Sequence, residues 1–118
     1  MASKKIEMYA EKQHELEELR ENLKTGMGFR WNEVEFKDEI LQEFGEARSL
    51  LLIFERYYVR NGSYASLVIL LSEFEGRQKA SVIATGGKET LFSWGAEGDF
   101  AKLGEDALRG LGFSVKTE

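Results

Sequence analysis

The sequence predicts an α+β fold in two layers, in which an antiparallel meander of about four strands packs against an N-terminal and a C-terminal helix. The first observation is the dipeptide Asn61-Gly62, which stands between two apolar runs rich in β-branched and aromatic residues. Asn-Gly tolerates the positive φ angles of a two-residue turn, so residues 50–74 are expected to form a long central hairpin. The second observation is the helical spacing of apolar residues near both ends of the chain.

The totals predict a small intracellular domain. The chain has 118 residues, no cysteine and no proline. This length is typical of one compact core, so we expect residues 1–118 to form a single α+β domain. The absence of cysteine excludes disulfides, thiolate metal sites and a cysteine nucleophile. No apolar run approaches the roughly 20 residues of a membrane-spanning helix, and the N-terminus becomes acidic before any signal-type segment. We therefore expect a cytoplasmic protein without a membrane partner.

The charge balance bears on the choice of partner. The formal net charge is −5 at pH 7, and most basic residues stand beside acids. Nucleic-acid binding depends on Lys and Arg that neutralise phosphates, so no nucleic-acid partner is expected. An acidic surface of this size most commonly serves solubility.

Residues 4–24 are expected to be helical. Their apolar positions recur at steps of three and four, and the glutamates between them supply a solvated side. Gly26 suits the C-cap of this helix. His14 is the only histidine and lies among glutamates, so we expect a solvated side chain rather than a catalytic or metal-binding one.

The segment 27–47 is ambiguous. Alternating apolar residues favour a strand over about 29–36, beginning near Phe29. After this strand, the spacing of Ile40, Leu41 and Phe44 favours a short helix, which would end at the following glycine.

Turn chemistry then sets the expected register of the hairpins. A two-residue loop at Asn61-Gly62 would place Phe54 opposite Ile69. A second tight turn at Glu75-Gly76 leads into a strand over 78–85, and it would pair the strands as follows: Leu71 with Ala80, Ile69 with Val82 and Leu67 with Ala84.

The C-terminal part is expected to close the sheet and cover it. Thr90–Trp94 reads as a short fourth strand, and Asp99 suits the N-cap of a helix over about 100–110. Phe113 and Val115 would add a last extended piece.

Alternation along these strands gives the sheet two apolar faces. The first face would lie under the helices. The second face carries the residues predicted to form an interaction surface: Leu51, Ile53, Tyr57, Val59, Tyr64, Val68, Leu70 and Ile83. Monomers rarely leave such a contiguous apolar patch exposed, so something should cover it. The candidates are the N-terminal helix, the segment 27–47 or the same face of a second subunit, and a homodimer is the simplest external answer.

We find no catalytic signature in the chain. Gly86-Gly87-Lys88 invites a phosphate-loop interpretation, but a Walker motif needs other glycine spacing, a following Ser or Thr and a helix, so a hairpin turn is the better interpretation. The acidic residues cannot be placed as a catalytic pair, and metal-ligand spacing is missing. No enzymatic activity and no cofactor are therefore expected.

One charged residue stands out within the apolar strands. Arg56 would lie on the helix-covered face, where Glu105 or Asp106 could pair with it. The alternative is an anion-binding groove between sheet and helix, lined by Arg56 together with Tyr58 and Trp94.

Several short blocks also resemble a known family. They are Phe54-Glu55-Arg56-Tyr57, Asn61-Gly62, Ser66-Leu67, Ala84-Thr85-Gly86-Gly87 and the closing helix from Phe100. Over residues 48–112 the chain resembles a small bacterial domain-of-unknown-function family. This resemblance implies an α+β domain and brings no activity with it.

Three functional hypotheses follow. The leading one is a non-enzymatic interaction domain that self-associates through its second sheet face. A variant is an acidic adaptor similar to secretion chaperones, which would bind a protein client. The third is a small anionic-ligand binder that uses the groove of Arg56, Tyr58 and Trp94.

Overall fold

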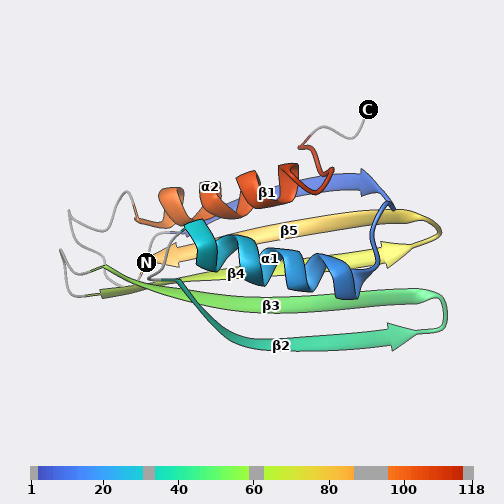
Figure 1. Ribbon diagram of the computed structural model, residues 1–118, viewed down its shortest axis with the longest axis horizontal. Coiled ribbons are helices and arrows are strands. Elements are labelled where there is room, and N and C mark those ends of the chain that lie inside the picture. The colour runs from blue at the N-terminus through green and yellow to red at the C-terminus, as the bar shows by residue number, and fades with distance from the viewer. Residues whose placement is uncertain (1–2, 31–33, 59–62, 87–95, 116–118) are drawn as a thin grey trace.

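The computed structural model describes residues 3–30, 34–58, 63–86 and 96–115, without the side chains of 28–30, 58, 63 and 96–99. The five strands form one antiparallel sheet in the order β1-β5-β4-β3-β2, and both helices lie on the same side of it (Figure 1). This confirms the α+β class, with five strands rather than about four. The elements in chain order are β1 (Ser3–Glu11), α1 (Leu16–Arg30), β2 (Val34–Phe44), β3 (Ala47–Tyr58), β4 (Ser63–Phe74), β5 (Arg77–Gly86) and α2 (Ala96–Arg109).

The prediction of one helix over 4–24 is wrong in its first half. Residues 3–11 form the edge strand β1, which pairs with β5, and helix α1 begins only at Leu16. In β1 the side chain of Met8 is fully buried, while its neighbours Glu7 and Tyr9 are only partly buried. This alternation has the period of two that is typical of a strand. In a segment this short, the same apolar residues can also fit the spacing of a helix. Gly26 lies inside α1 and is not its C-cap.

The short helix predicted around Ile40 is also wrong, because residues 34–44 form β2 alongside β3. The register shifts between Phe36 and Asp38, as at a β-bulge, which reverses the side-chain alternation within one strand. This reversal breaks the strand pattern in the sequence and resembles a change to helical spacing. Gly45 has a φ of 60° and opens the two-residue turn into β3. Of the strand predicted over 29–36, only the part from Val34 is confirmed.

The β4–β5 hairpin has the predicted register. Leu71 pairs with Ala80, and the other two predicted pairs of these strands are likewise present. In the turn, Glu75 has a φ of 53° and Gly76 a φ of 77°. Two positive φ angles are those of a type I′ turn, whose twist matches that of the flanking strands.

The predicted register of the β3–β4 hairpin is wrong by two residues. Phe54 pairs with Leu67 rather than with Ile69, and Tyr58 is the last residue of β3 to pair, with Ser63. The connection therefore spans residues 59–62, which lie outside the described residues. Because side chains alternate with a period of two, a shift of two leaves every side chain on its predicted face.

Helix α2 covers the part of the sheet formed by β1, β5 and β4, whereas α1 lies near β3 and β2. The helix begins at Ala96, so Asp99 lies within its first turn and the predicted N-cap is wrong. The strand predicted at Thr90–Trp94 lies outside the described residues. The predicted last extended piece is an isolated bridge between Ser114 and Tyr9 of β1.

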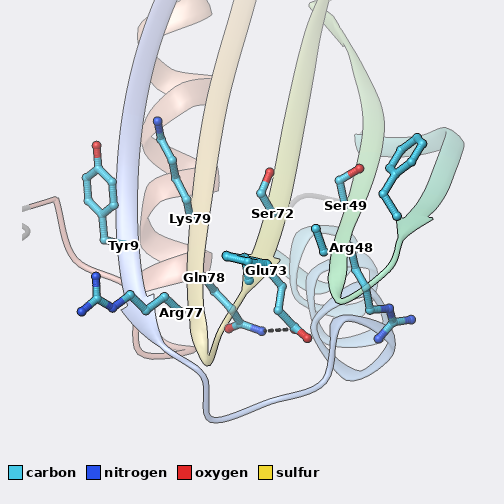
Figure 2. A pocket seen from close by; sticks show the side chains of 11 residues that line it. Tyr9, Arg48, Ser49, Ser72, Glu73, Arg77, Gln78 and Lys79 are labelled. Carbon is cyan, nitrogen blue, oxygen red and sulfur yellow. Dashed lines mark hydrogen bonds between the residues drawn. The ribbon is translucent and has the colours of Figure 1, made fainter.

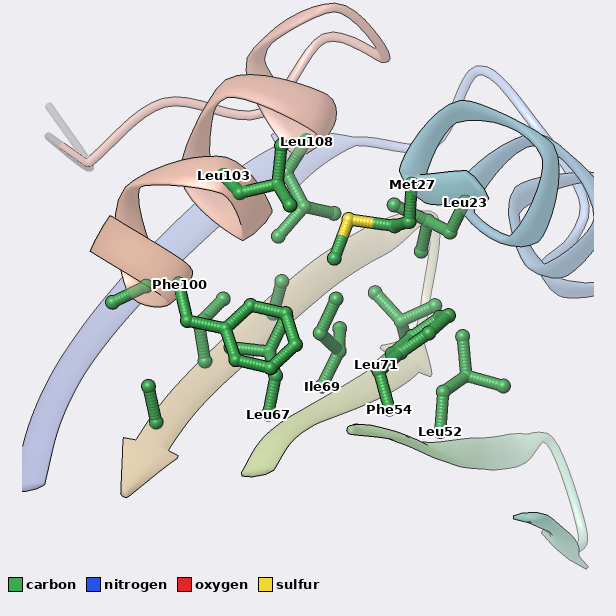
Figure 3. Close-up of a cluster of buried hydrophobic side chains, with 14 of the residues drawn as sticks. Leu23, Met27, Leu52, Phe54, Leu67, Ile69, Leu71, Phe100, Leu103 and Leu108 are labelled. Carbon is green, nitrogen blue, oxygen red and sulfur yellow. The ribbon is translucent and has the colours of Figure 1, made fainter. Parts of the chain in front are cut away.

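The core fills the space between the helices and the first face of the sheet (Figure 3). A methyl group on Gly104 of α2 would lie 3.2 Å from Val82 Cγ1 and 3.3 Å from Leu67 Cδ2, so glycine lets this helix lie close to the sheet. Among the described residues, neither helix has the length and apolarity needed to cross a membrane. The largest fully buried side chains are Phe54, Phe100, Met8, Leu16, Leu19, Leu23, Met27, Leu50, Leu52, Leu67, Ile69 and Leu71.

Candidate functional site

The second face of the sheet, called the open face below, points away from both helices (Figure 1). Two chain segments were candidates to cover it. The N-terminal helix packs on the opposite face, where Leu19 and Leu23 are fully buried, and residues 34–44 extend the sheet as β2. Within the ranges that the structure describes, no helix or strand lies over the open face. Its apolar side chains therefore face outward.

The predicted interaction residues share this face, as the strand pairing shows. Tyr57 is 41% exposed and Tyr64 is 55% exposed. Val59 lies outside the described residues. The remaining five, half-buried or exposed, form the centre of the open face: Leu51, Ile53, Val68, Leu70 and Ile83.

Sequence reasoning missed three apolar residues that extend this surface. Ile40 pairs with Leu51 on the open face, and Phe44, which is 73% exposed, pairs with Ala47. Phe74 ends β4 on the same face and is also exposed. The missed signal was the glycine after Phe44, because a glycine at the first position of a two-residue turn is typical of a type II′ hairpin. That turn would have predicted β2 as a strand.

A hollow of about 380 Å³ lies at one end of the open face, next to the β2–β3 and β4–β5 turns (Figure 2). Small side chains line its centre, since Ser49 pairs with Ser72 and Ala47 lies one step along the same face. Tyr9 and Phe44 line it on opposite sides, on the two edge strands. The hollow is therefore a depression with three small residues at its centre, and Phe74, Arg77 and Lys79 also line it.

The opposite end of the open face carries a bulky projection. Tyr57 of β3 pairs with Tyr64 of β4, and their ring centroids are 4.9 Å apart with the planes tilted by 54°. Cross-strand aromatic pairs of this kind hold each other in place. This tyrosine pair and the hollow thus lie at opposite ends of one surface.

Charged residues form the rim of the open face along β1. Glu7 forms two ion pairs, with Lys79 at 3.4 Å and with Lys5 at 3.8 Å. Exposed pairs like these contribute little to stability, at most about 1 kcal/mol each. An apolar and aromatic centre with a charged rim is typical of protein interfaces.

The edges of the sheet are poorly suited to pairing with another chain. Edge strand β2 carries Glu35, Lys37, Asp38 and Glu43, and the register shift near Lys37 interrupts its edge. Charged side chains and bulges are the usual devices against edge-to-edge association. On the other edge, Ser114 exchanges two backbone hydrogen bonds with Tyr9 of β1, of 2.8 and 2.9 Å. The open face, rather than an edge, is the available surface.

A polar cluster lies on the helix side of the same sheet end. The buried carboxylate of Glu73 accepts hydrogen bonds from Lys12 Nζ at 3.0 Å and from Gln78 Nε2 at 2.9 Å. Burial by itself would raise the pKa of Glu73, but the hydrogen bonds from Gln78 and Lys12 outweigh it and hold this pKa below 4.5. The Glu73 hydrogen bond also raises the pKa of Lys12 above 10.5. Gln78 Nε2 also donates to the backbone oxygen of His14 at 2.9 Å. These hydrogen bonds hold the β1–α1 connection against the sheet.

Arg48 of β3 adds ion pairs with α1 and β2 at the same end of the sheet. Its guanidinium forms an ion pair with Glu17 of α1 and another with Glu43 of β2, the latter at 3.0 Å. The hydrogen bond with Arg48 lowers the pKa of Glu17, and the same bond raises that of Arg48. All these groups have structural partners, and within the described ranges no set of three His, Cys, Asp or Glu side chains is arranged to hold a metal ion. The predicted solvated His14 lies before α1, with Nδ1 3.1 Å from Glu18 Oε2.

The predicted anion-binding groove falls mostly outside the described residues. Arg56 lies on the helix-covered face, opposite Ala65, but the side chain of Tyr58 and the whole of Trp94 lie outside the description. The acids proposed as partners of Arg56 form ion pairs within α2. Glu105 accepts a hydrogen bond from Arg109 at 2.7 Å, and Asp106 accepts one from Lys102 at 3.2 Å. Of the glycine turn at 86–88, only Gly86 at the end of β5 is described.

Comparison with protein families gives a match over most of the chain. Residues 1–112 match DUF6054, a family of unknown function, so the similarity includes the N-terminal strand and helix as well as residues 48–112. No curated protein matches the chain. A match over nearly the whole chain shows that this protein belongs to the DUF6054 family.

Proposed function

We propose that this protein is a non-enzymatic interaction domain that forms a homodimer through its open face. The observation that supports it is the outward-facing apolar surface centred on Leu51 and Leu70, with the Tyr57–Tyr64 pair at one end of the face, beyond the Glu55–Ser66 pair. Exposed apolar patches larger than a few hundred Å² mark interaction sites in soluble proteins.

The size of the open face suits a dimer. Five strands spaced by about 4.8 Å, each about ten residues long with a rise of about 3.3 Å, give a footprint of about 800 Å². A standard protein interface buries about 800 Å² on each partner. Sheets that pack face to face lie about 10 Å apart and interdigitate their side chains, as the two inner faces of a β-sandwich do. One face of this sheet is thus large enough to form half of such a sandwich.

A second copy of the chain is the occupant that fits this surface. In a two-fold dimer the same patch lies on both subunits, so an apolar centre meets an apolar centre and a mixed-charge rim meets a mixed-charge rim. The rim on β1 carries both signs within one short stretch, Lys5 and Glu7. It can therefore face its own copy without a net repulsion.

Two neighbouring residues of β2 provide a matched test. Ile40 is 54% exposed on the open face, whereas Leu41 is 40% exposed on the opposite face. In size-exclusion chromatography with light scattering, we expect Ile40→Asp and the central Leu70→Asp to shift the protein to monomer, because an unpaired carboxylate in a buried interface is costly. Leu41→Asp should leave the dimer intact. Circular dichroism must show a native spectrum for each variant. A dimer that survives both open-face variants would overturn the proposal.

A further inference from the structure

We infer that the two copies stack with their strands antiparallel across the interface, so that the tyrosine pair of each copy enters the hollow of the other. This inference rests on the proposed homodimer. It adds the orientation of the two copies and the contact that specifies it.

Two orientations are open to a face-to-face dimer whose sheets pack in the aligned manner. The two-fold axis must lie in the plane between the sheets, and aligned sheets keep their strand directions within about 30° of each other. The axis therefore runs either along the strands or across them. An axis along the strands brings the same ends of the two sheets together. An axis across the strands brings opposite ends together.

The shape of the open face distinguishes these orientations. With the axis along the strands, tyrosine pair would meet tyrosine pair, and the 380 Å³ hollow of one copy would face that of the other. The projections would hold the sheets apart while the hollows left a void between them, and voids in an interface lose contact energy on both sides. With the axis across the strands, each projection faces a hollow.

The strand register locates the axis of the second orientation. Ala47 in the hollow and Tyr57 in the projection are equally far from Leu52 along β3. On β4, Phe74 and Tyr64 are equally far from Ile69, and Leu52 pairs with Ile69. An axis over this pair places Tyr57 over Ala47 of the partner subunit and Tyr64 over Phe74 of the partner subunit. The same axis serves both strands because Tyr57 pairs with Tyr64 and Leu52 with Ile69.

The same axis continues onto β5 and β1. It crosses β5 at Val82, which pairs with Ile69, and β1 at Ile6, which pairs with Val82. Lys5 and Glu7 stand on either side of Ile6, so Lys5 of each copy lies over Glu7 of the partner subunit. The orientation that fits the tyrosine pair to the hollow thus places opposite charges together at the rim.

The orientation can be measured with one spin label per chain, because the protein has no cysteine of its own. Glu46 is exposed in the β2–β3 turn, far from the axis, and Glu46→Cys provides the attachment site. With antiparallel stacking the two labels lie at opposite ends of the dimer, about 40 Å apart, at a rise of about 3.3 Å per residue. With parallel stacking they lie at the same end, roughly 20 Å apart, across a sheet spacing of about 10 Å. Double electron–electron resonance on a sample that light scattering shows to be dimeric distinguishes the two distances.

The contact itself can be tested by exchanging bulk between the two positions. Tyr57→Ala removes a projecting ring, and Ala47→Phe fills the hollow that receives it. Each single variant should raise the dimer Kd by about tenfold or more, as for an aromatic residue that fills a pocket of its partner. The double variant should recover affinity, because the new ring occupies the space that the lost ring leaves. As a control, Ala47→Phe combined with Ile83→Ala should show no recovery.

These outcomes separate the inference from the proposed function. A monomeric native protein would overturn both. A dimer with labels roughly 20 Å apart, or losses that simply add in the Tyr57→Ala and Ala47→Phe pair, would overturn the antiparallel stacking and leave the homodimer standing.

Discussion

Tyr57 and Tyr64 lie opposite each other on β3 and β4, with ring centroids 4.9 Å apart, on the sheet face that points away from both helices. Both rings are well exposed in a single chain. Aromatic side chains that stand out from a sheet in this way are among the residue types that dominate binding energy in protein interfaces. The pair is therefore the most informative feature of the open face.

The tyrosine pair should matter more for association than for folding. In Tyr64→Ala, the loss of one cross-strand pair should lower the free energy of unfolding of the monomer by about 0.2–1 kcal/mol. The same change should raise the dimer Kd by about tenfold or more, because an interface aromatic residue is lost. Urea unfolding at low concentration measures the first quantity, and sedimentation equilibrium measures the second. An unchanged Kd would contradict an interface role for this ring.

Adjacent leucines of β4 should respond differently to truncation. Leu71 is fully buried under the helices, whereas Leu70 lies half-buried on the open face. Leu71→Ala should lower the free energy of unfolding by about 2–5 kcal/mol at any protein concentration, because it leaves a cavity. For Leu70→Ala the loss should be small when the protein is dilute and should grow as the concentration rises, since dimerisation stabilises the folded state. Urea titrations at two concentrations test this pair, and equal losses at both sites would contradict the assignment of the faces.

Two helix glycines should show opposite effects. A methyl group on Gly26 meets no atom within 4 Å, so Gly26→Ala should raise the free energy of unfolding by about 0.5–1 kcal/mol through better helix propensity. At Gly104 a larger side chain would press on Val82 and Leu67, so Gly104→Val should lower it by about 1–3 kcal/mol. Gly26→Val controls for the β-branched side chain and should change stability far less than Gly104→Val. Thermal or urea unfolding decides between these values.

The buried carboxylate of Glu73 should make stability depend on pH in the acidic range. The pKa of Glu73 is held below its ordinary value of 4.5 in the folded protein. Its contribution to the free energy of unfolding is therefore fully present above about pH 4.5, and it is lost as the pH falls through the lower pKa of the folded state. Glu73→Gln should lower the free energy of unfolding by about 1–3 kcal/mol at neutral pH, because it disrupts a buried hydrogen-bonded group. The difference in the free energy of unfolding between the native protein and this variant should narrow as the pH falls below 4.5. Urea unfolding midpoints of both proteins from pH 7 to pH 3 test this. A difference between the two midpoints that stays constant over this range would contradict the stabilising role of the Glu73 carboxylate.

The central part of the fold could be predicted because its signals are local. Glu75-Gly76 is a dipeptide that takes two positive φ angles in a tight turn, and it set the β4–β5 register correctly. At the β3–β4 connection, the Asn61-Gly62 signal led to an error of two residues in register. That error left the two faces unchanged, so the apolar residues of the open face were still assigned to one surface. Period-two alternation made this conclusion robust.

The N-terminal part could not be predicted in the same way, because long-range pairing determines it. Strand β1 pairs with β5, which lies far along the chain, and its short alternation competes with a helical interpretation. In β2 the register shift near Lys37 reverses the alternation, which no local rule reveals. The hollow depends on both strands, since Tyr9 comes from β1 and Phe44 from β2. Sequence reasoning therefore found the centre of the open face and missed its most distinctive feature.

The mass of the native protein in solution is the most direct test of the proposed dimer. Sedimentation equilibrium should give twice the mass of one chain at micromolar concentrations, with a reversible fall toward the mass of one chain on dilution. A protein that stays monomeric up to high micromolar concentrations, with its open face free, would contradict the account.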